Sequence, residues 1–179
     1  MADILNRFPS KILEPIIKIA EEVRKADGQA LIVGGAVRDS LIDVEAKEID
    51  MEIRGIEPVA LRTLLSRKHG LDEYGKSFGI LKLKGLPIEI ALPRTETKIA
   101  TGHRGFDVEV DPHLPFPEAA ARRDFTINAM GMNPLSGEVL DPHGGQRDLE
   151  KRILRHIGPA FTEDPLRVLR GMHFVARLN

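Results

Sequence analysis

The stretch Ala30-Leu31-Ile32-Val33-Gly34-Gly35-Ala36-Val37-Arg38-Asp39 decides the fold, because it joins a strand, a glycine turn and the start of a helix. Residues 30–33 are all apolar, which is typical of a short buried strand. The two glycines let backbone N–H groups approach a phosphate, and the start of the helix predicted over 37–41 adds favourable partial charge. A simple tight turn explains the glycines equally well. Arg38 could reach phosphate oxygens, or it could pair with Asp39 or another nearby acid.

Acidic and apolar residues alternate in Glu48-Ile49-Asp50-Met51-Glu52, which predicts a half-buried strand over 48–53 with the acids on one face. Clustered carboxylates repel one another unless a cation lies among them, and Mg²⁺ prefers such oxygen ligands. Two ions ~4 Å apart could activate an attacking hydroxyl and neutralise a leaving pyrophosphate. For this stripe taken alone, a solvated strand face is the better explanation.

Glu89 lies on the polar face of a strand predicted over 87–92, which forms a hairpin around Gly85 with a strand predicted over 79–84. A neighbouring antiparallel strand would put Glu89 beside the first acids as a third carboxylate. An exposed strand residue is an equally good interpretation.

The remaining elements complete a small α/β layer. A helix is predicted over 10–26, with Ser10 as its cap and Gly28 as its stop signal, and another over 57–68. Residues 95–118 lose all periodicity and contain repeated Gly and Pro, which predicts a long functional loop. After it, the pattern predicts a mostly helical segment (118–130), a short strand (139–140), a short helix (146–152) and a final helix from near Thr162 that is still running at Asn179.

Arginines and acids recur at two helix starts. Arg122 and Arg123 precede Asp124, and an arginine fork suits a polyphosphate. Asp124 could accept from ribose hydroxyls, and Asn128 could hold sugar or phosphate; a charged helix start explains one arginine better than two.

Glu163 and Asp164 suit the first turn of the final helix, with Thr162 as its cap. That structural role does not account for Arg167, which lies on the same face as Asp164. An acceptor and a donor side by side can read the Watson–Crick edge of a base.

Composition bounds the function classes. The 179 residues suit one domain with a short appendage, and 42% apolar residues are enough for a sizeable core. A formal charge of −1 does not indicate a general nucleic-acid binder, although a local basic patch is compatible with it. The absence of cysteine excludes disulfides and thiolate zinc sites, and is compatible with a cytoplasmic protein. No signal peptide and no membrane-spanning run are expected, and the six histidines show no metal-ligand spacing.

With these residues in hand, the chain resembles the class II tRNA nucleotidyltransferase and bacterial poly(A) polymerase family. Residues 33–39 match G-G-x-V-R-D, residues 47–50 stand where the family carries its metal-binding carboxylate pair, residues 122–129 match R-R-D-x-x-x-N-A, and residues 163–167 match E-D-x-x-R. The stretches 91–98 and 152–170 are most similar to bacterial CCA-adding enzymes. The match runs from about Leu31 to the end.

The resemblance implies a polymerase-β-like nucleotidyltransferase head, of α/β (α+β) class, with a small mixed sheet and packed helices. We therefore expect an N-terminal helix packed on the head (1–28), the catalytic head (29–157) and the start of a helical neck (158–179). Residues 97–116 fall where the family has a flexible loop that helps to switch between CTP and ATP.

The resemblance also implies residue roles. Glu48 and Asp50 would bind Mg²⁺, and with Glu89 they would form the catalytic carboxylates. The remaining matched residues would bind nucleotide: Gly34, Gly35 and Arg38 the triphosphate, Arg123, Asp124 and Asn128 the phosphate and ribose, and Asp164 and Arg167 the base of ATP or CTP.

Two departures from the family pattern matter. The family pair is usually Asp-x-Asp, whereas this chain has Glu48-x-Asp50, and the extra methylene could shift a metal ligand. Asp50 and Glu52 could form the pair instead, but Lys47 before Glu48 matches the family register better. The family also continues into helical body and tail regions that grip tRNA, whereas this chain stops inside the helix of Arg167. A truncated or reduced protein with a weak grip on RNA is expected.

The leading hypothesis is metal-dependent transfer of CMP and AMP from CTP and ATP to a tRNA 3′ end, with release of pyrophosphate. The same head could instead add a poly(A) tract to other RNA 3′ ends. A nucleotide-binding module without polymerase turnover is the third hypothesis. The sequence carries no indication of oligomeric state.

Overall fold

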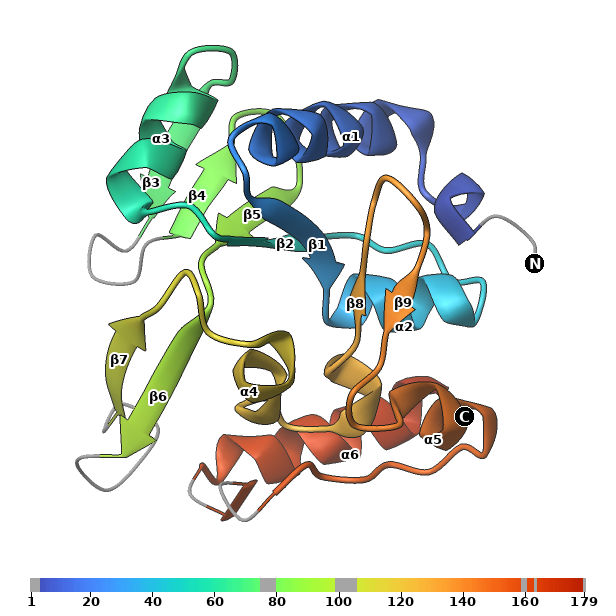
Figure 1. The fold of residues 1–179 in the computed structure, drawn as a ribbon. Coiled ribbons are helices and arrows are strands. Elements are labelled where there is room, and N and C mark those ends of the chain that lie inside the picture. Colours follow the sequence, from blue (N-terminus) through green and yellow to red (C-terminus); the bar gives the residue numbers. More distant parts are fainter. Residues whose placement is uncertain (1–3, 75–79, 99–105, 159–160, 163, 179) are drawn as a thin grey trace.

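The computed structural model describes residues 4–74, 80–98, 106–158, 161–162 and 164–178 (Figure 1). Among them, seven strands form one mixed sheet in the order β3-β4-β5-β2-β1-β8-β9, and two more form a separate antiparallel sheet, β6-β7. The strands of the large sheet are β1 (Gln29–Val33), β2 (Ile49–Arg54), β3 (Leu71–Tyr74), β4 (Ile80–Leu83), β5 (Ile88–Ala91), β8 (Gly131–Met132) and β9 (Val139–Leu140). Those of the small sheet are β6 (Arg94–Lys98) and β7 (Phe106–Val110).

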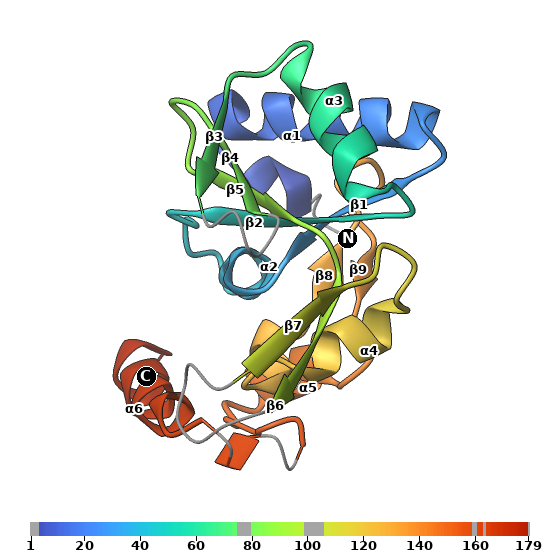
Figure 2. The same cartoon turned by 90° about the vertical axis from the view of Figure 1, so that its left-hand side faces the viewer.

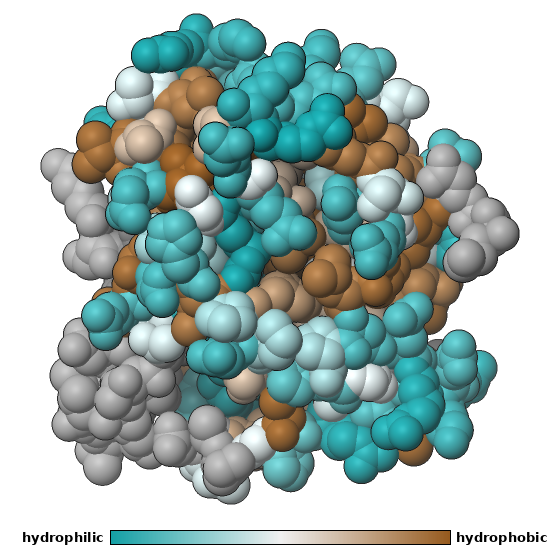
Figure 3. All heavy atoms as spheres, viewed as in Figure 1, coloured by the Kyte–Doolittle hydropathy of each residue, from teal (hydrophilic) through white to brown (hydrophobic). Residues whose placement is uncertain are grey.

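Helices cover the large sheet from both sides (Figures 1 and 2). On one side lie α1 (Ser10–Lys25) and α3 (Pro58–Ser66), and on the other lie α2 (Gly35–Leu41), α4 (Phe116–Ala121), α5 (Gly145–Glu150) and α6 (Leu166–Leu178). Two short 3₁₀ helices, η1 (Ile4–Arg7) and η2 (Thr126–Asn128), complete the described elements. The lower half of the molecule, around α5 and α6, presents mainly hydrophilic residues on the face shown in Figure 3.

Strand β1 is buried on both faces, which accounts for its uninterrupted apolar sequence. Ala30 and Ile32 belong to the larger core together with the apolar side of α1, whereas Leu31 and Val33 pack with Phe116 of α4. A strand covered on both sides has no solvent face and needs no polar alternation. The prediction for 30–33 is therefore confirmed.

Several other predicted elements are also confirmed. The strand expected over 48–53 is β2, and the hairpin around Gly85 is formed by β4 and β5, with Gly79 outside the described residues. The helices expected over 57–68 and 146–152 are α3 and α5, and the short strand at 139–140 is β9. Strands β3 and β8 were not predicted.

The start of α1 differs from the prediction. Ser10 is the first helical residue, Pro9 occupies the N-cap position, and no side chain caps the helix. Pro9 has extended backbone angles suited to this position, and its carbonyl accepts from the N–H groups of Ile12 and Leu13. At the other end Asp27, with φ 59°, takes the left-handed position, and the Gly28 N–H closes the turn onto Val23 O.

The long loop expected over 95–118 is wrong for the part that the structure describes. Residues 94–98 and 106–110 pair as β6 and β7 in register Arg94↔Val110, and Phe116 already begins α4. Thr and Val at alternate positions favour strands, whereas the Gly and Pro residues flank them. The centre of the expected switching loop, 99–105, lies outside the described residues.

The mostly helical segment expected over 118–130 is also wrong. Helix α4 ends at Ala121, Phe125 is extended, and only η2 follows. The Asp124 carboxylate accepts from the Phe125 N–H, and the Thr126 hydroxyl donates to Asp148. The first is a local side-chain hydrogen bond, which competes with a continuous helix, and the second fixes Thr126 to a residue 22 positions away.

The final helix starts later than expected. Helix α6 begins at Leu166 and not near Thr162, because Pro165 disfavours helical geometry at the residue before it. The Asp164 Oδ1 accepts from the Leu166 N–H and so supports the helix start. Glu163 and Asn179 lie outside the described residues. Within the described part of the chain, no helix has the length and apolar character needed to cross a membrane.

Candidate active site

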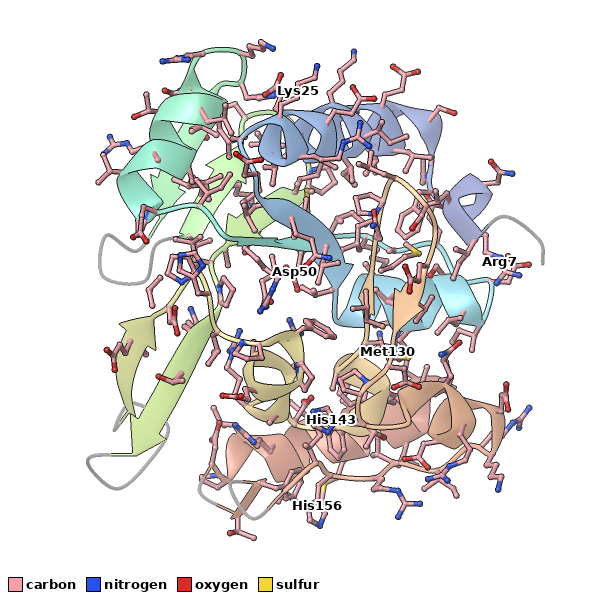
Figure 4. All side chains as sticks on the ribbon, viewed as in Figure 1. Arg7, Lys25, Asp50, Met130, His143 and His156 are labelled. Carbon is pink, nitrogen blue, oxygen red and sulfur yellow. The ribbon has the colours of Figure 1, made fainter. Side chains whose placement is uncertain are left out.

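A polar cleft of about 790 Å³ separates the sheet from α6, and most of the predicted site residues line it. Figure 4 shows Asp50 on β2, above the helices of the lower half. The cleft is lined by residues of three regions: Gly35, Arg38, Lys47, Glu48 and Asp50 of the sheet and its turn, Arg122, Arg123, Asp124 and Asn128 after α4, and Asp164, Arg167, Arg170, His173, Phe174 and Arg177 at the final helix.

Asp50 is the carboxylate at the centre of this cleft. Burial raises the pKa of Asp50, and the carboxylates of Glu89 and Glu48 raise it further, whereas the guanidinium groups of Arg123 and Arg122 lower it. Asp50 is an exposed residue because its side chain is open to the cleft, whereas the walls of the cleft partly desolvate its carboxyl group. A divalent cation would relieve this crowding of negative charge.

Glu52 lies on the same face of β2 but is not available to a ligand. The residue is 3% exposed, and its Oε1 lies 2.7 Å from the Nη1 of Arg54. Arg54 stands two residues further along the strand and therefore on the same face. The solvated strand face is thus wrong for Glu52, which is buried and paired with Arg54.

Glu89 lies beside Asp50, but in a different arrangement from the predicted one. Strands β2 and β5 run parallel, with Asp50 opposite Glu89 in register. The antiparallel neighbour of Glu89 is β4, where Lys82 forms an ion pair with it at 3.2 Å. Glu89 therefore stands next to the acidic pair, although it does not line the cleft wall.

Gly34 brings an arginine next to these carboxylates. Its backbone has φ 75° and ψ −135°, a conformation suited to glycine, and a Cβ on it would lie 2.7 Å from Arg123 Nη1 and 3.8 Å from Asp50 Oδ2. The Gly34 N–H donates to Met130 O, so this amide is used within the protein. The glycine thus gives Arg123 room to pass close to Asp50.

Arg38 and Asn128 form a buried network below the cleft. Arg38 donates from Nε and Nη2 to Asp39 Oδ1 at 2.9 and 2.7 Å, and from Nη1 to Asn128 Oδ1. Asn128 Nδ2 in turn donates to Asp124 Oδ1 at 3.0 Å. Of the two interpretations left open for Arg38, the structure shows pairing with Asp39.

Helix α6 supplies the far wall. Arg167 donates from Nη2 to the Arg122 carbonyl at 2.8 Å, which holds the start of α6 against the paired-arginine turn. Arg170 contacts Asp124, and Arg177 contacts Asp39. Sequence reasoning missed Arg170, His173, Phe174 and Arg177, but their spacing after Arg167 repeats at three or four residues and could have shown one shared face.

The acidic pair alone does not complete a metal site. Among the described residues, no three histidine or acidic side chains gather as metal ligands. Glu48 and Asp50 offer carboxylate oxygens, the donors that hard divalent ions prefer, and such ions readily take water and phosphate oxygens as further ligands. The donor set therefore fits a cation that is shared with a bound phosphate.

The chain is similar to known proteins in sequence and in fold. The family model described as the poly A polymerase head domain matches residues 30–155. A curated relative, the multifunctional CCA protein of Xanthomonas campestris pv. campestris, is 47% identical over 147 residues, which make up 82% of this chain and 35% of the relative.

Two solved structures share the fold. The Thermotoga maritima CCA-adding enzyme complexed with tRNA matches 96% of this chain and 39% of its own, with a TM-score of 0.75 and 28% identity. The Bacillus stearothermophilus CCA-adding enzyme in complex with CTP matches 89% of this chain and 38% of its own, with a TM-score of 0.72 and 27% identity.

These matches confirm the expected α/β head, a small mixed sheet with helices packed on it. The chain spans about a third of the length of the curated relative that it matches. The family model covers more than half of this chain and contains the glycine turn, the acidic strand and the paired arginines. The chain belongs to the poly(A) polymerase head domain family.

Proposed function

We propose that this chain is the nucleotidyltransferase head of an enzyme that adds CMP and AMP from CTP and ATP to the 3′ end of tRNA. The observation that carries the proposal is one cleft lined by carboxylates of the sheet region and by arginines of two other segments: Glu48, Asp50, Arg123, Asp164 and Arg167. The relatives support it, since one is a CCA protein, one CCA-adding enzyme was solved with tRNA and another with CTP.

Nucleotidyltransferases generally use divalent metal ions, and we propose Mg²⁺ here, held by Glu48 and Asp50. When bound, the metal would supply positive charge at the phosphates and lower the pKa of an attacking hydroxyl. Glu89, opposite Asp50 in register, is proposed as the third carboxylate of the site.

The protein side chains would mainly position the reactants. The RNA 3′-hydroxyl attacks the α-phosphorus, the bond from that phosphorus to the bridging oxygen breaks, and pyrophosphate leaves. Arg123, next to Asp50, would neutralise phosphate charge, together with the backbone N–H of Gly35. Gly34, whose own N–H donates to Met130, would contribute the room that Arg123 needs. Arg38 would act through Asn128, since its guanidinium is used within the protein. Asp164 and Arg167 would pair with the base, and Asp124 would accept from the ribose.

We also propose the division expected above: an N-terminal helix on the head (1–28), the head (29–157) and the start of a neck (158–179). The apolar side of α6 supports the last of these. Leu166, Val168, Leu169, Met172 and Val175 are all between 43% and 64% exposed, as expected for a helix that packs against further helices.

Nucleotide incorporation tests the proposal. Three tRNA transcripts, ending before C-C, after the first C and after C-C, are incubated with labelled CTP or ATP and Mg²⁺, and the products are sized. Stepwise addition that stops at C-C-A supports the proposal, provided that the D50A variant is inactive. If D50A incorporated nucleotide at the wild-type rate, the assignment of the active site to this cleft would be refuted.

Two alternatives give different products. Poly(A) addition, which the name of the family model favours, would give a long A tract on a defined RNA with ATP alone. A nucleotide-binding module is favoured by Glu48, which stands where the family usually has Asp, and it would bind ATP saturably without extending RNA even at high tRNA concentration.

A further inference from the structure

Asp124 is almost completely buried, and described residues already occupy most of its hydrogen-bonding capacity. Its Oδ1 accepts from the Phe125 N–H at 2.9 Å and from Asn128 Nδ2 at 3.0 Å. Its Oδ2 accepts from Arg170 Nε at 2.7 Å. A carboxylate offers about four acceptor positions, so one remains, on Oδ2 beside Arg170. Since Asp124 lines the cleft, this position is the one that a ligand hydroxyl could use.

Arg170 contacts the ring of Phe174 as well as the carboxylate of Asp124. Its guanidinium lies 5.6 Å from the ring centre of Phe174, and Arg38 lies 5.0 Å from the same ring. Phe174 is buried and packs edge-on against Phe125, the residue after Asp124. The contact with Phe174 therefore restricts the position of the Arg170 Nε donor. The hydrogen bond from this donor in turn orients the Asp124 carboxylate.

A second ion pair ties the same helix to the head without touching Asp124. Arg177 Nη2 lies 2.9 Å from Asp39 Oδ2, and Asp39 is as buried as Asp124. Arg170 and Arg177 thus make similar contacts from one helix to two buried carboxylates. Asp39 also keeps one acceptor position on Oδ2, because Arg38 fills Oδ1 with two donors, and Asp39 also lines the cleft. The two pairs differ because the proposed function assigns the ribose to Asp124 and not to Asp39.

From these contacts we infer that Arg170 is a positioning residue for sugar recognition, which turns Asp124 Oδ2 toward a ribose hydroxyl of the bound nucleotide. The inference rests on the proposed function, because it needs a ribonucleotide in the cleft. A site built to accept a hydroxyl hydrogen bond discriminates against the deoxy analogue, since its acceptor is then left unpaired. Without Arg170, Asp124 keeps its two contacts on Oδ1 but loses the group that orients Oδ2.

The test is equilibrium binding of ATP, 2′-deoxy-ATP and 3′-deoxy-ATP to the chain with Mg²⁺ and without RNA. The wild type is compared with R170Q, with the conservative R170K and with R177Q as the matched control. Wild type is expected to prefer ATP over at least one deoxy analogue by about tenfold, the size of one good hydrogen bond. R170Q should bring this ratio close to one, and R170K should restore part of it. R177Q should weaken all three nucleotides by one factor and keep the ratio.

Three outcomes would overturn the inference. The wild type binds ATP and both deoxy analogues equally, R170Q keeps the wild-type ratio, or R177Q loses the ratio as completely as R170Q does. The last two would show that Arg170 only clamps α6. A wild-type chain that binds no nucleotide would refute the proposed function itself, and the inference with it.

Discussion

Asp50 and Glu52 project from the same face of β2, yet their surroundings give them different roles. Asp50 opens into the cleft, and burial raises its pKa. Glu52 is closed off and paired with Arg54. The alternating sequence of the strand correctly predicts that the two acids share a face. It does not indicate that this face is exposed at Asp50 and buried at Glu52.

Replacing Asp50 by Asn is expected to separate activity from stability. Incorporation should fall at least about 100-fold, because even outer-shell partners of a metal contribute 10- to 100-fold. The melting temperature should stay equal or rise, because a raised pKa means that the folded state disfavours the charged form at neutral pH. Steady-state incorporation and thermal unfolding in metal-free buffer measure the two effects.

Glu52→Gln, two residues away, should show the opposite pattern. It leaves Arg54 buried without its charge partner, at a cost of about 3–5 kcal/mol in unfolding free energy. Activity per folded molecule should be retained at a temperature where the variant is folded. An inactive but stable Glu52→Gln beside an active Asp50→Asn would reverse the assignment of these two acids.

At the scale of elements, the glycine turn between β1 and α2 combines two requirements. Gly34 needs a positive φ, and it leaves room for Arg123. Gly85, between β4 and β5, also has φ 75°, but no neighbouring heavy atom would meet its Cβ within 4 Å. A substitution at Gly85 would therefore cause backbone strain alone, whereas one at Gly34 would cause the same strain and also displace Arg123.

Gly34→Ala and Gly85→Ala should both lower the unfolding free energy, by about 1–2 kcal/mol or more for the strained backbone. Only Gly34→Ala should also weaken nucleotide binding, because its Cβ would displace Arg123 from Asp50. Denaturant unfolding and nucleotide titration measure the two effects. Equal affinities in both variants would mean that the position of Arg123 does not matter for binding.

Asp148 of α5 holds the segment after α4 in its non-helical path. It accepts from the Thr126 hydroxyl at 2.8 Å and from Arg155 Nε at 2.9 Å. The hydrogen bond from Arg155 lowers the pKa of Asp148, against the effect of burial, and Thr126 lowers it further. These distant partners explain why a local reading of residues 118–130 predicted a helix.

The lowered pKa sets the sign of a pH effect. Stability from charged Asp148 should be fully present above its unfolded pKa, near 3.8, and should be lost as pH falls through the lower folded value. Asp148→Asn should therefore cost about 1–3 kcal/mol at pH 7, and its difference from wild type should shrink below about pH 4. Urea unfolding between pH 7 and pH 3 measures the difference. A gap that stays constant over this range would exclude the charged pair as its source.

At the scale of the whole molecule, the net charge does not reveal that arginines gather in the cleft. The chain carries 26 basic and 27 acidic residues, which does not indicate an anion-binding protein. The fold nevertheless gathers Arg122 and Arg123 from one segment with Arg167, Arg170 and Arg177 from another. The glycine turn, the acidic strand and the two arginine motifs could be predicted because each is contiguous in sequence. The Asp124–Arg170 and Asp39–Arg177 pairs could not, because they join residues 46 and 138 positions apart.

Because the cleft lies between the sheet and α6, a nucleotide bound there should stabilise the whole chain. ATP with Mg²⁺ at about 100 times the dissociation constant should raise the unfolding free energy by about 2.7 kcal/mol. Mg²⁺ alone should give a smaller gain, since two carboxylates leave most of its ligand positions to water and phosphate. The gain should shrink at high salt, which screens the attraction between the arginines of the cleft and the phosphates.

Thermal melts with Mg²⁺, ATP and both, in wild type and Asp50→Asn, measure these effects. Asp50→Asn should lose the part of the gain that depends on Mg²⁺ and keep the part that ATP gives alone. If ATP with Mg²⁺ stabilised wild type no more than Mg²⁺ does, the nucleotide would not bridge the sheet and α6.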